Sequence, residues 1–211
     1  MAQLVDELTV RGELDAAALE WARSHQAVHG GTLDSALLEL DLIDEDALLS
    51  SLESYYELPA GRPADATGAD PDAAKRVPRS LSEALAMCPV RIADGKLVAL
   101  VEQSLSDRWV EELRFAGLGV KQLVVPAHYI DLARAQVYGP PCPERARELE
   151  RRLAKRRQAA AIGHVVAGIQ HAPTLAAATV LALDFAECLV SFSCFLVSNG
   201  RTVRVGAVSG G

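Results

Sequence analysis

Leucines recur at helical spacing through the first sixty residues of the chain. They fall into two groups: Leu4, Leu8, Leu14 and Leu19, and then Leu33, Leu37, Leu40, Leu48 and Leu52. Gly12 and the segment LDLID interrupt the pattern, and Asp15 and Asp44 stand where a helix N-cap would accept hydrogen bonds from free backbone N–H groups. The pattern therefore predicts short helices that bury their leucine faces in a small bundle.

A tight hairpin is predicted in the middle of the chain. Asp94 and Gly95 separate two runs rich in strand-forming residues, CPVRIA and KLVALV, and both residue types tolerate the positive φ of a type I′ turn. The flanking pattern predicts a helix over 78–87 and, within 104–119, a second helix that ends at Gly117. It also predicts a strand in KQLVVP and a closing helix over 127–139. This α-β-β-α-β-α order indicates a small three-stranded sheet covered by helices.

Composition shifts divide the chain into five parts, and together they predict an α+β protein. Residues 1–59 form a helical subdomain, and 60–78, rich in Pro, Gly, Ala and Asp without an apolar period, are a flexible linker or a long loop. Residues 79–139 are an α/β subdomain, 140–160 are a basic linker helix, and 161–211 are a partial α/β segment.

Residues 161–211 again combine a helix with a hairpin, but they do not make up a complete α/β domain. Residues 174–189 predict a helix, and 191–208 predict a second hairpin with Asn199 and Gly200 at its turn. Because a two-stranded sheet is marginal alone, we expect the chain to be the front of a longer polypeptide. The order of helix and hairpin is similar to the opening of GAF-like sensory domains, which implies a regulatory protein.

Charge narrows the classes of partner. The chain has 211 residues, of which 50% are hydrophobic and 23% charged, so an ordinary folded protein is expected. Its net charge is -7, which argues against a nucleic acid partner, because phosphate neutralisation needs a surplus of Lys and Arg. Residues 1–59 carry thirteen acidic and two basic side chains, whereas 144–158 carry three acidic and seven basic ones.

The sequence also predicts a cytoplasmic protein without a membrane span. Cys88, Cys142, Cys188 and Cys194 lie far apart with no C-x-x-C, and the acidic N-terminus does not resemble a signal peptide. Residues 158–183 lack charged side chains and follow a basic run, as a membrane helix would. Their many alanines and internal polar residues instead favour two short core helices, because polar groups are costly inside a bilayer.

The residues give little support to an enzyme, a metal site or a cofactor site. A P-loop needs a Lys and a hydroxyl after its second glycine, and the nearest match, Gly163 to Gly168, is followed by Ile and Gln. His25 and His29 are four residues apart, but a zinc site needs three or four ligands. No G-x-S-x-G is present. We therefore predict no catalytic residue, no metal and no cofactor.

The first helical segment contains a repeated frame. Residues 3–26, QLVDELTVRGELDAAALEWARSHQ, follow the pattern R-L-G-x-x-L-x-x-x-G with L, L and Q further on, and after a five-residue spacer 32–55, TLDSALLELDLIDEDALLSSLESY, restart it. With the downstream residues to 139, this double motif resembles the MshEN domain, the N-terminal domain of type II secretion and type IV pilus assembly ATPases. In that family the domain binds cyclic di-GMP or docks the ATPase onto inner-membrane assembly proteins.

The resemblance assigns seven residues of this chain to a ligand groove: Leu4, Leu8, Gly12, Arg23, Gln26, Leu33 and Leu37. The cationic and glycine positions of the motif have changed, however: Gln3 and Thr32 replace Arg, and Val5, Asp34 and Asp41 replace Gly. Two lost charge-assisted hydrogen-bonding groups cost about 3 to 6 kcal/mol, or two to four decades of affinity. Arg23, at a Leu position, compensates only if it points into the groove.

Three functions remain open at this stage. The first is a non-enzymatic, regulatory interaction module that docks a protein partner, such as a secretion or pilus inner-membrane component, through its acidic helical face. The second is a cyclic di-GMP receptor, which the lost arginines make less favourable. The third is a regulatory part of a longer secretion-motor protein whose enzyme domain lies elsewhere.

Overall fold

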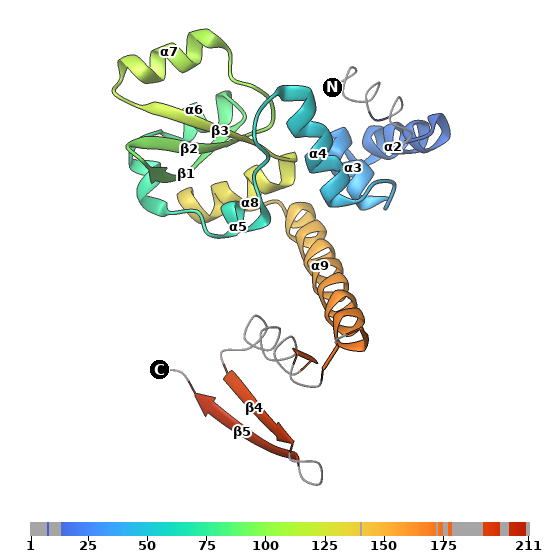
Figure 1. Cartoon of the computed structure of the whole chain (residues 1–211). Helices are drawn as coiled ribbons and strands as arrows, with labels where there is room; N and C mark the ends of the chain where they lie inside the picture. Colours follow the sequence, from blue (N-terminus) through green and yellow to red (C-terminus); the bar gives the residue numbers. More distant parts are fainter. Residues whose placement is uncertain are drawn as a thin grey trace. The chain divides into compact units, whose positions relative to one another are not determined.

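The structure is a computed structural model that describes Leu8 and residues 14–139, 141–171, 173–174, 177–178, 192–198 and 203–209. The chain divides into two compact units, Met1–Arg152 and Leu153–Gly211. The first unit contains the helical segment and the sheet together, so the two subdomains predicted from composition share one compact unit (Figure 1).

The helical segment contains three described helices, α2 (Ala16–His29), α3 (Leu33–Glu39) and α4 (Glu45–Tyr56), which confirms the predicted bundle. Asp15 caps α2, since its side chain accepts a 2.6 Å hydrogen bond from the backbone N–H of Ala18. Asp44 is the N-cap residue of α4, but its side chain makes no capping hydrogen bond. The leucine faces form the core, with the following side chains buried: Leu8, Leu14, Leu33, Leu37, Leu48 and Leu52.

The predicted hairpin is present as strands β1 (Met87–Ala93) and β2 (Lys96–Val101), which pair antiparallel from Ala93↔Lys96. Asp94 and Gly95 have φ of 52° and 71°, as a type I′ turn requires. Strand β3 (Gly119–Val124) pairs parallel with β2, so the sheet order is β1-β2-β3. Helix α7 (Asp107–Phe115) makes the crossover that a parallel connection needs.

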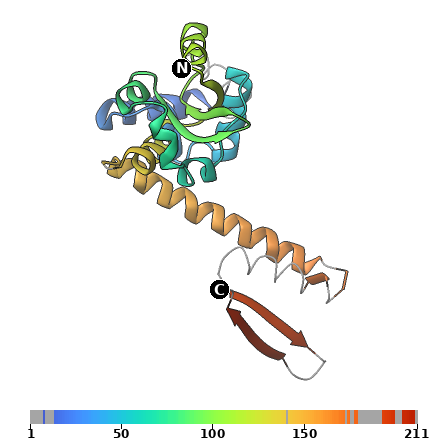
Figure 2. The ribbon, with the colours of Figure 1, turned by 90° about the vertical axis from the view of Figure 1, so that its left-hand side faces the viewer.

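Helices cover the sheet, as expected, and they lie on both of its faces (Figures 1 and 2). Helix α7 lies on one side, and α8 (Ala127–Tyr138) lies on the other with α5 (Pro63–Thr67). The core beneath α8 includes Tyr129, Ile130 and Ala133 of that helix, packed with Val90 and Leu100 of the strands. Helix α6 (Arg79–Ala84) precedes β1.

Residues 60–78 differ from the flexible linker or long loop that their composition predicts. They contain α5 and the 3-10 helix η1 (Pro71–Lys75), and Ala66 and Ala69 belong to the main core. The physical reason is that these alanines are small enough to pack closely against the sheet, although they leave no periodic pattern of large apolar residues. Asp65 fixes the turn into α5 by accepting from the backbone N–H of Arg62, and it also pairs with Arg91 of β1.

The chain also crosses the free edge of β3 just before α5. The N–H of Val124 donates to the carbonyl of Pro59 at 3.0 Å, and the N–H of Gly61 donates to the carbonyl of Val124 at 2.9 Å. A Cβ added at Gly61 would lie 2.5 Å from Cγ1 of Val125. Position 61 therefore needs glycine because backbone passes directly over a core side chain.

The basic segment forms the long helix α9 (Glu144–Gln170). In the second unit, β4 (Phe192–Ser198) and β5 (Val203–Ser209) pair antiparallel with Ser198 opposite Val203, which confirms the second hairpin, while its predicted turn lies outside the described residues. Most of the helix predicted over 174–189 also lies outside them. Within the described part of the chain, no helix is long and apolar enough to span a membrane.

We predict that Gly61→Ala destabilises the first unit by about 1 to 3 kcal/mol, because the added methyl group overpacks the site beside Val125. Urea unfolding followed by circular dichroism measures the change. Gly163→Ala is the matched control, since a Cβ there meets nothing within 4 Å and replaces glycine inside a helix. Equal midpoints for wild type and Gly61→Ala would contradict the close approach.

Candidate functional site

Three of the leucines assigned to the ligand groove are core residues in this structure. Leu8, Leu33 and Leu37 are buried, and Leu37 is only 2% exposed. Arg23 is exposed on α2, and the side chain of Gln26 donates a 2.9 Å hydrogen bond to the carbonyl of Gly31. Leu4 and Gly12 lie outside the described residues. The described leucines therefore contribute to packing, and Gln26 fixes the turn between α2 and α3.

Asp34, which stands at a glycine position of the second motif, has a structural role in this chain. Its side chain is only 4% exposed. Its Oδ2 accepts a 2.8 Å hydrogen bond from the backbone N–H of Ala127, the first residue of α8. Asp34 thus supplies the cap that Pro126, at the N-cap position, does not provide.

Asp41, at the second glycine position of that motif, is exposed and has a φ of 59°. The chain turns here between α3 and α4, and Asp is among the few non-glycine residues that adopt the left-handed region at low cost. The preference for glycine at this position therefore has a backbone explanation in this chain, without any ligand.

Arg145, near the start of α9, binds the helical segment through its whole guanidinium group. It forms a bidentate pair with Glu39, with Nε and Nη2 each 2.5 Å from a carboxylate oxygen. Its Nη1 donates to the carbonyls of His29 and Gly30, at 2.8 and 2.7 Å, where α2 ends. Cations are favoured at such C-terminal carbonyls, and the Glu39 side chain is mostly buried. The first basic residue of the linker helix is therefore a structural anchor.

A pocket of about 310 Å³ lies where the α2–α3 turn meets the beginnings of α8 and α9. Thr32, at an arginine position of the motif, lines it, and Thr32 Oγ1 lies 2.9 Å from Ser35 Oγ. Among the described lining residues, Arg145 is the only Lys or Arg, and its donors are directed to Glu39 and the α2 carbonyls. Glu39 and Asp131 also line the pocket, so its charge disfavours the binding of a dianion.

Burial raises the pKa values of several titratable side chains. Burial raises the pKa of the Cys88 thiol to about 12, so it stays protonated and a poor nucleophile. Burial also raises the pKa of Tyr138 to about 12, and its hydroxyl donates a 2.7 Å bond to the carbonyl of Val77. The pKa values of Glu102 and Asp131 are raised, again mainly by burial.

The two histidines singled out in the sequence do lie together. The rings of His25 and His29 are 4.5 Å apart, and Nδ1 of His25 is 3.7 Å from Oε2 of Glu39. In the described ranges, however, no three His, Cys, Asp or Glu side chains are arranged to hold a metal ion.

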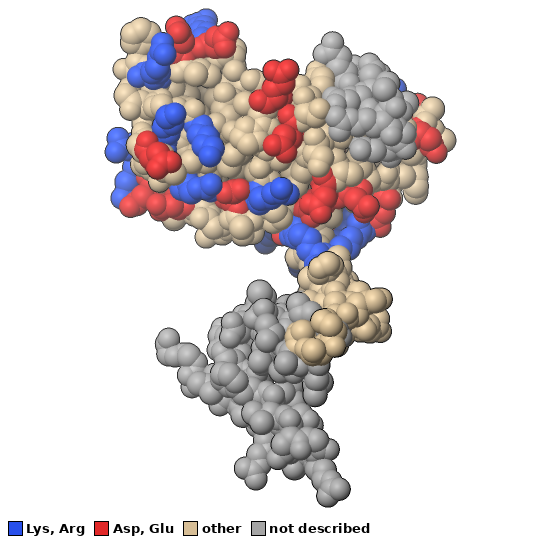
Figure 3. Space-filling model, viewed as in Figure 1, with Lys and Arg blue, Asp and Glu red and all other residues tan. Residues whose placement is uncertain are grey.

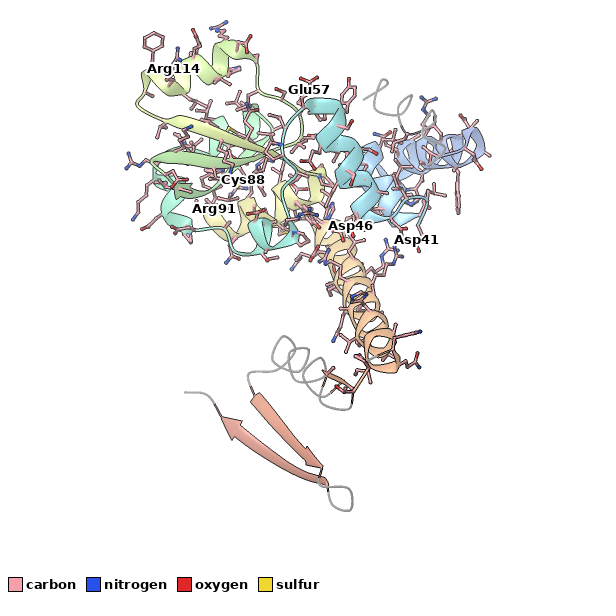
Figure 4. The ribbon with its side chains drawn as sticks, viewed as in Figure 1. Asp41, Asp46, Glu57, Cys88, Arg91 and Arg114 are labelled. Atoms are coloured by element: carbon pink, nitrogen blue, oxygen red, sulfur yellow. The ribbon has the colours of Figure 1, made fainter. Side chains whose placement is uncertain are left out.

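The helical segment presents an acidic surface, which we define by these exposed side chains: Asp15, Glu20, Asp41, Asp44, Asp46, Glu53 and Glu57. Figure 4 shows Asp46 and Glu57 at opposite ends of α4, and Figure 3 shows acidic side chains over this helix. Arg23 is the one exposed Lys or Arg among the described residues 14–57, against these seven carboxylates. The surface is therefore strongly negative.

Residues 56–144 match the model of the MshEN domain family, in agreement with the resemblance seen in the sequence. The two motif frames, 3–26 and 32–55, lie outside the matched residues. No curated protein is similar in sequence to this chain.

Similar solved structures include MshE with cdg, at 22% identity and a TM-score of 0.44, over 64% of this chain and 98% of that one. The N-terminal domain of XpsE is similar at 24% identity and a TM-score of 0.35, over 63% of this chain and 93% of that one.

We predict that Asp34→Gly lowers the free energy of unfolding by about 1 to 3 kcal/mol, because the N–H of Ala127 loses its acceptor inside the protein. Asp34→Asn is the matched control, since its amide oxygen still accepts that hydrogen bond. Urea denaturation measures both. If the two variants lose the same stability, the cap is not the role of this side chain.

Arg145→Met should lower stability by about 2 to 3 kcal/mol, because Glu39 is left mostly buried without its partner and two carbonyls of α2 lose their donor. Arg151→Met removes an exposed pair with Glu148 on the same helix and should change stability by less than about 0.5 kcal/mol. Thermal unfolding measures the stability of both variants. Similar losses of stability in the two would contradict the anchoring role of Arg145.

Proposed function

We propose that this chain is a non-enzymatic, regulatory interaction module of the MshEN type that docks a protein partner through its acidic surface. The partner we favour is an inner-membrane assembly component of a secretion or pilus system, in the cytoplasm. The family match over residues 56–144 supports the class of domain, and the charge of residues 14–57 supports the mode of docking.

One observation carries the proposal: residues at positions of the cyclic di-GMP motif stabilise the fold of this chain. Asp34 caps α8, Leu33 and Leu37 are in the core, and Asp41 occupies a left-handed turn. The exposed charged side chains of residues 14–57 are seven carboxylates and Arg23, so the segment repels a dianionic cyclic dinucleotide and attracts a basic protein surface. Opposite charges at an interface mainly raise the association rate, and this effect weakens as salt screens it.

The triple variant Asp44→Asn, Asp46→Asn and Glu53→Gln tests the docking. We expect it to slow association with a purified inner-membrane assembly protein about tenfold at low salt, measured by surface plasmon resonance. Asp107→Asn, Glu111→Gln and Glu112→Gln on α7 remove the same number of carboxylates outside the acidic surface and should leave the rate nearly unchanged.

Two results would overturn the proposal. One is association that is equally slowed by the two triple variants or does not respond to salt. The other is calorimetric heat on titrating cyclic di-GMP at micromolar concentration, which would favour the receptor function instead.

A further inference from the structure

Helix α2 exposes an apolar stripe within the acidic segment. Ala17, Trp21, Ser24 and Val28 follow one another at steps of four, three and four residues, so they share one helix face, and all four are exposed. Trp21 is 56% exposed and Val28 is 77% exposed. Ala22 of the same helix is buried, so α2 packs inward through a different face.

The spacing gives this stripe the form of a helix-docking site. Single exposed apolar residues are common on protein surfaces, but Trp21 and Val28 lie two helical turns apart, about 10 Å, along one line. A partner helix presents its own apolar side chains at the same three- and four-residue steps. Exposed tryptophan is also the residue type most enriched among those that dominate binding energy at interfaces.

The charges of the helical segment limit what can cover the stripe. The exposed charged side chains of 14–57 are the seven carboxylates of the acidic surface and Arg23, so anionic lipid and nucleic acid are repelled. A second copy of the same face would bring carboxylates against carboxylates, which costs free energy. A helix with lysines and arginines beside its apolar residues meets both requirements.

We propose that Trp21 and Val28 are the apolar anchor for the partner on this segment and that the occupant of the stripe is a basic amphipathic helix of the partner protein. This inference rests on the proposed function and adds the kind of segment that is recognised. The carboxylates steer the basic helix to the surface, and its apolar side chains then cover Trp21 and Val28. The remaining polar position of the stripe, Ser24, lies between the two anchors.

The experiment uses a synthetic amphipathic helical peptide of Lys, Leu and Ala, and a control peptide with Glu in place of Lys. The chain has two tryptophans, so in the Trp109→Phe protein Trp21 alone reports by fluorescence. We expect the Lys peptide to shift the emission of Trp21 to shorter wavelength as water is excluded. Trp21→Ala should weaken binding of the Lys peptide about tenfold or more, measured by calorimetry.

Phe115→Ala is the matched control, because Phe115 is 88% exposed but lies on α7, and it should leave the affinity unchanged. Val28→Ser gives a second, smaller change at the stripe and guards against an effect of Trp21→Ala on folding; it should weaken binding severalfold.

The outcomes separate this inference from the proposed function. Peptide binding that is lost in the acidic triple variant but unaffected by Trp21→Ala, with no emission shift, overturns the anchor and leaves charge-driven docking intact. Absence of Lys-peptide binding at low salt also overturns the anchor. Equal binding of the Lys and Glu peptides overturns the charge requirement, and with it the docking mode of the proposed function.

Discussion

The hydrogen bond from the backbone of Ala127 to the carboxylate of Asp34 joins the helical segment to the helix that covers the sheet. Helix α8 begins after a proline that cannot cap it, so an acceptor must come from elsewhere in the chain. Two further contacts act at the same junction: Tyr129 of α8 with Glu45 of α4, and residues 59–61 along β3. Together they explain why the two predicted subdomains form one unit.

This arrangement gives the degenerate motif a physical meaning. Burying the carboxylate of Asp34 without a hydrogen-bond donor would cost free energy, and in this chain the N–H of Ala127 is the donor. Arg145 similarly uses its charge within the protein, on Glu39 and on the end of α2. Polar side chains that could have served a ligand thus stabilise the fold, while carboxylates of the same helices face solvent. This distribution of charge is the basis of the protein docking that we propose.

Much of the local structure followed from the sequence. Asp94 and Gly95 predicted the hairpin because few residues accept positive φ, and Gly117 marked the end of α7 for the same reason. Leucine spacing located the helices of the bundle. The linker prediction for 60–78 was less successful, because Ala66 and Ala69 enter the core without a periodic apolar pattern, and Gly61 serves a close approach rather than flexibility.

The sequence by itself determined the order of elements in 79–139, the two hairpins, the charge of each segment and the family resemblance, since these depend on local backbone preferences and residue counts. The tertiary structure decided which face each polar residue serves. Asp34 and Arg145 find partners 93 and 106 residues away, and no local pattern encodes such contacts. Exposure of Trp21 was likewise decided by packing, because α2 carries apolar residues on more than one face and only the neighbouring helices select which is buried.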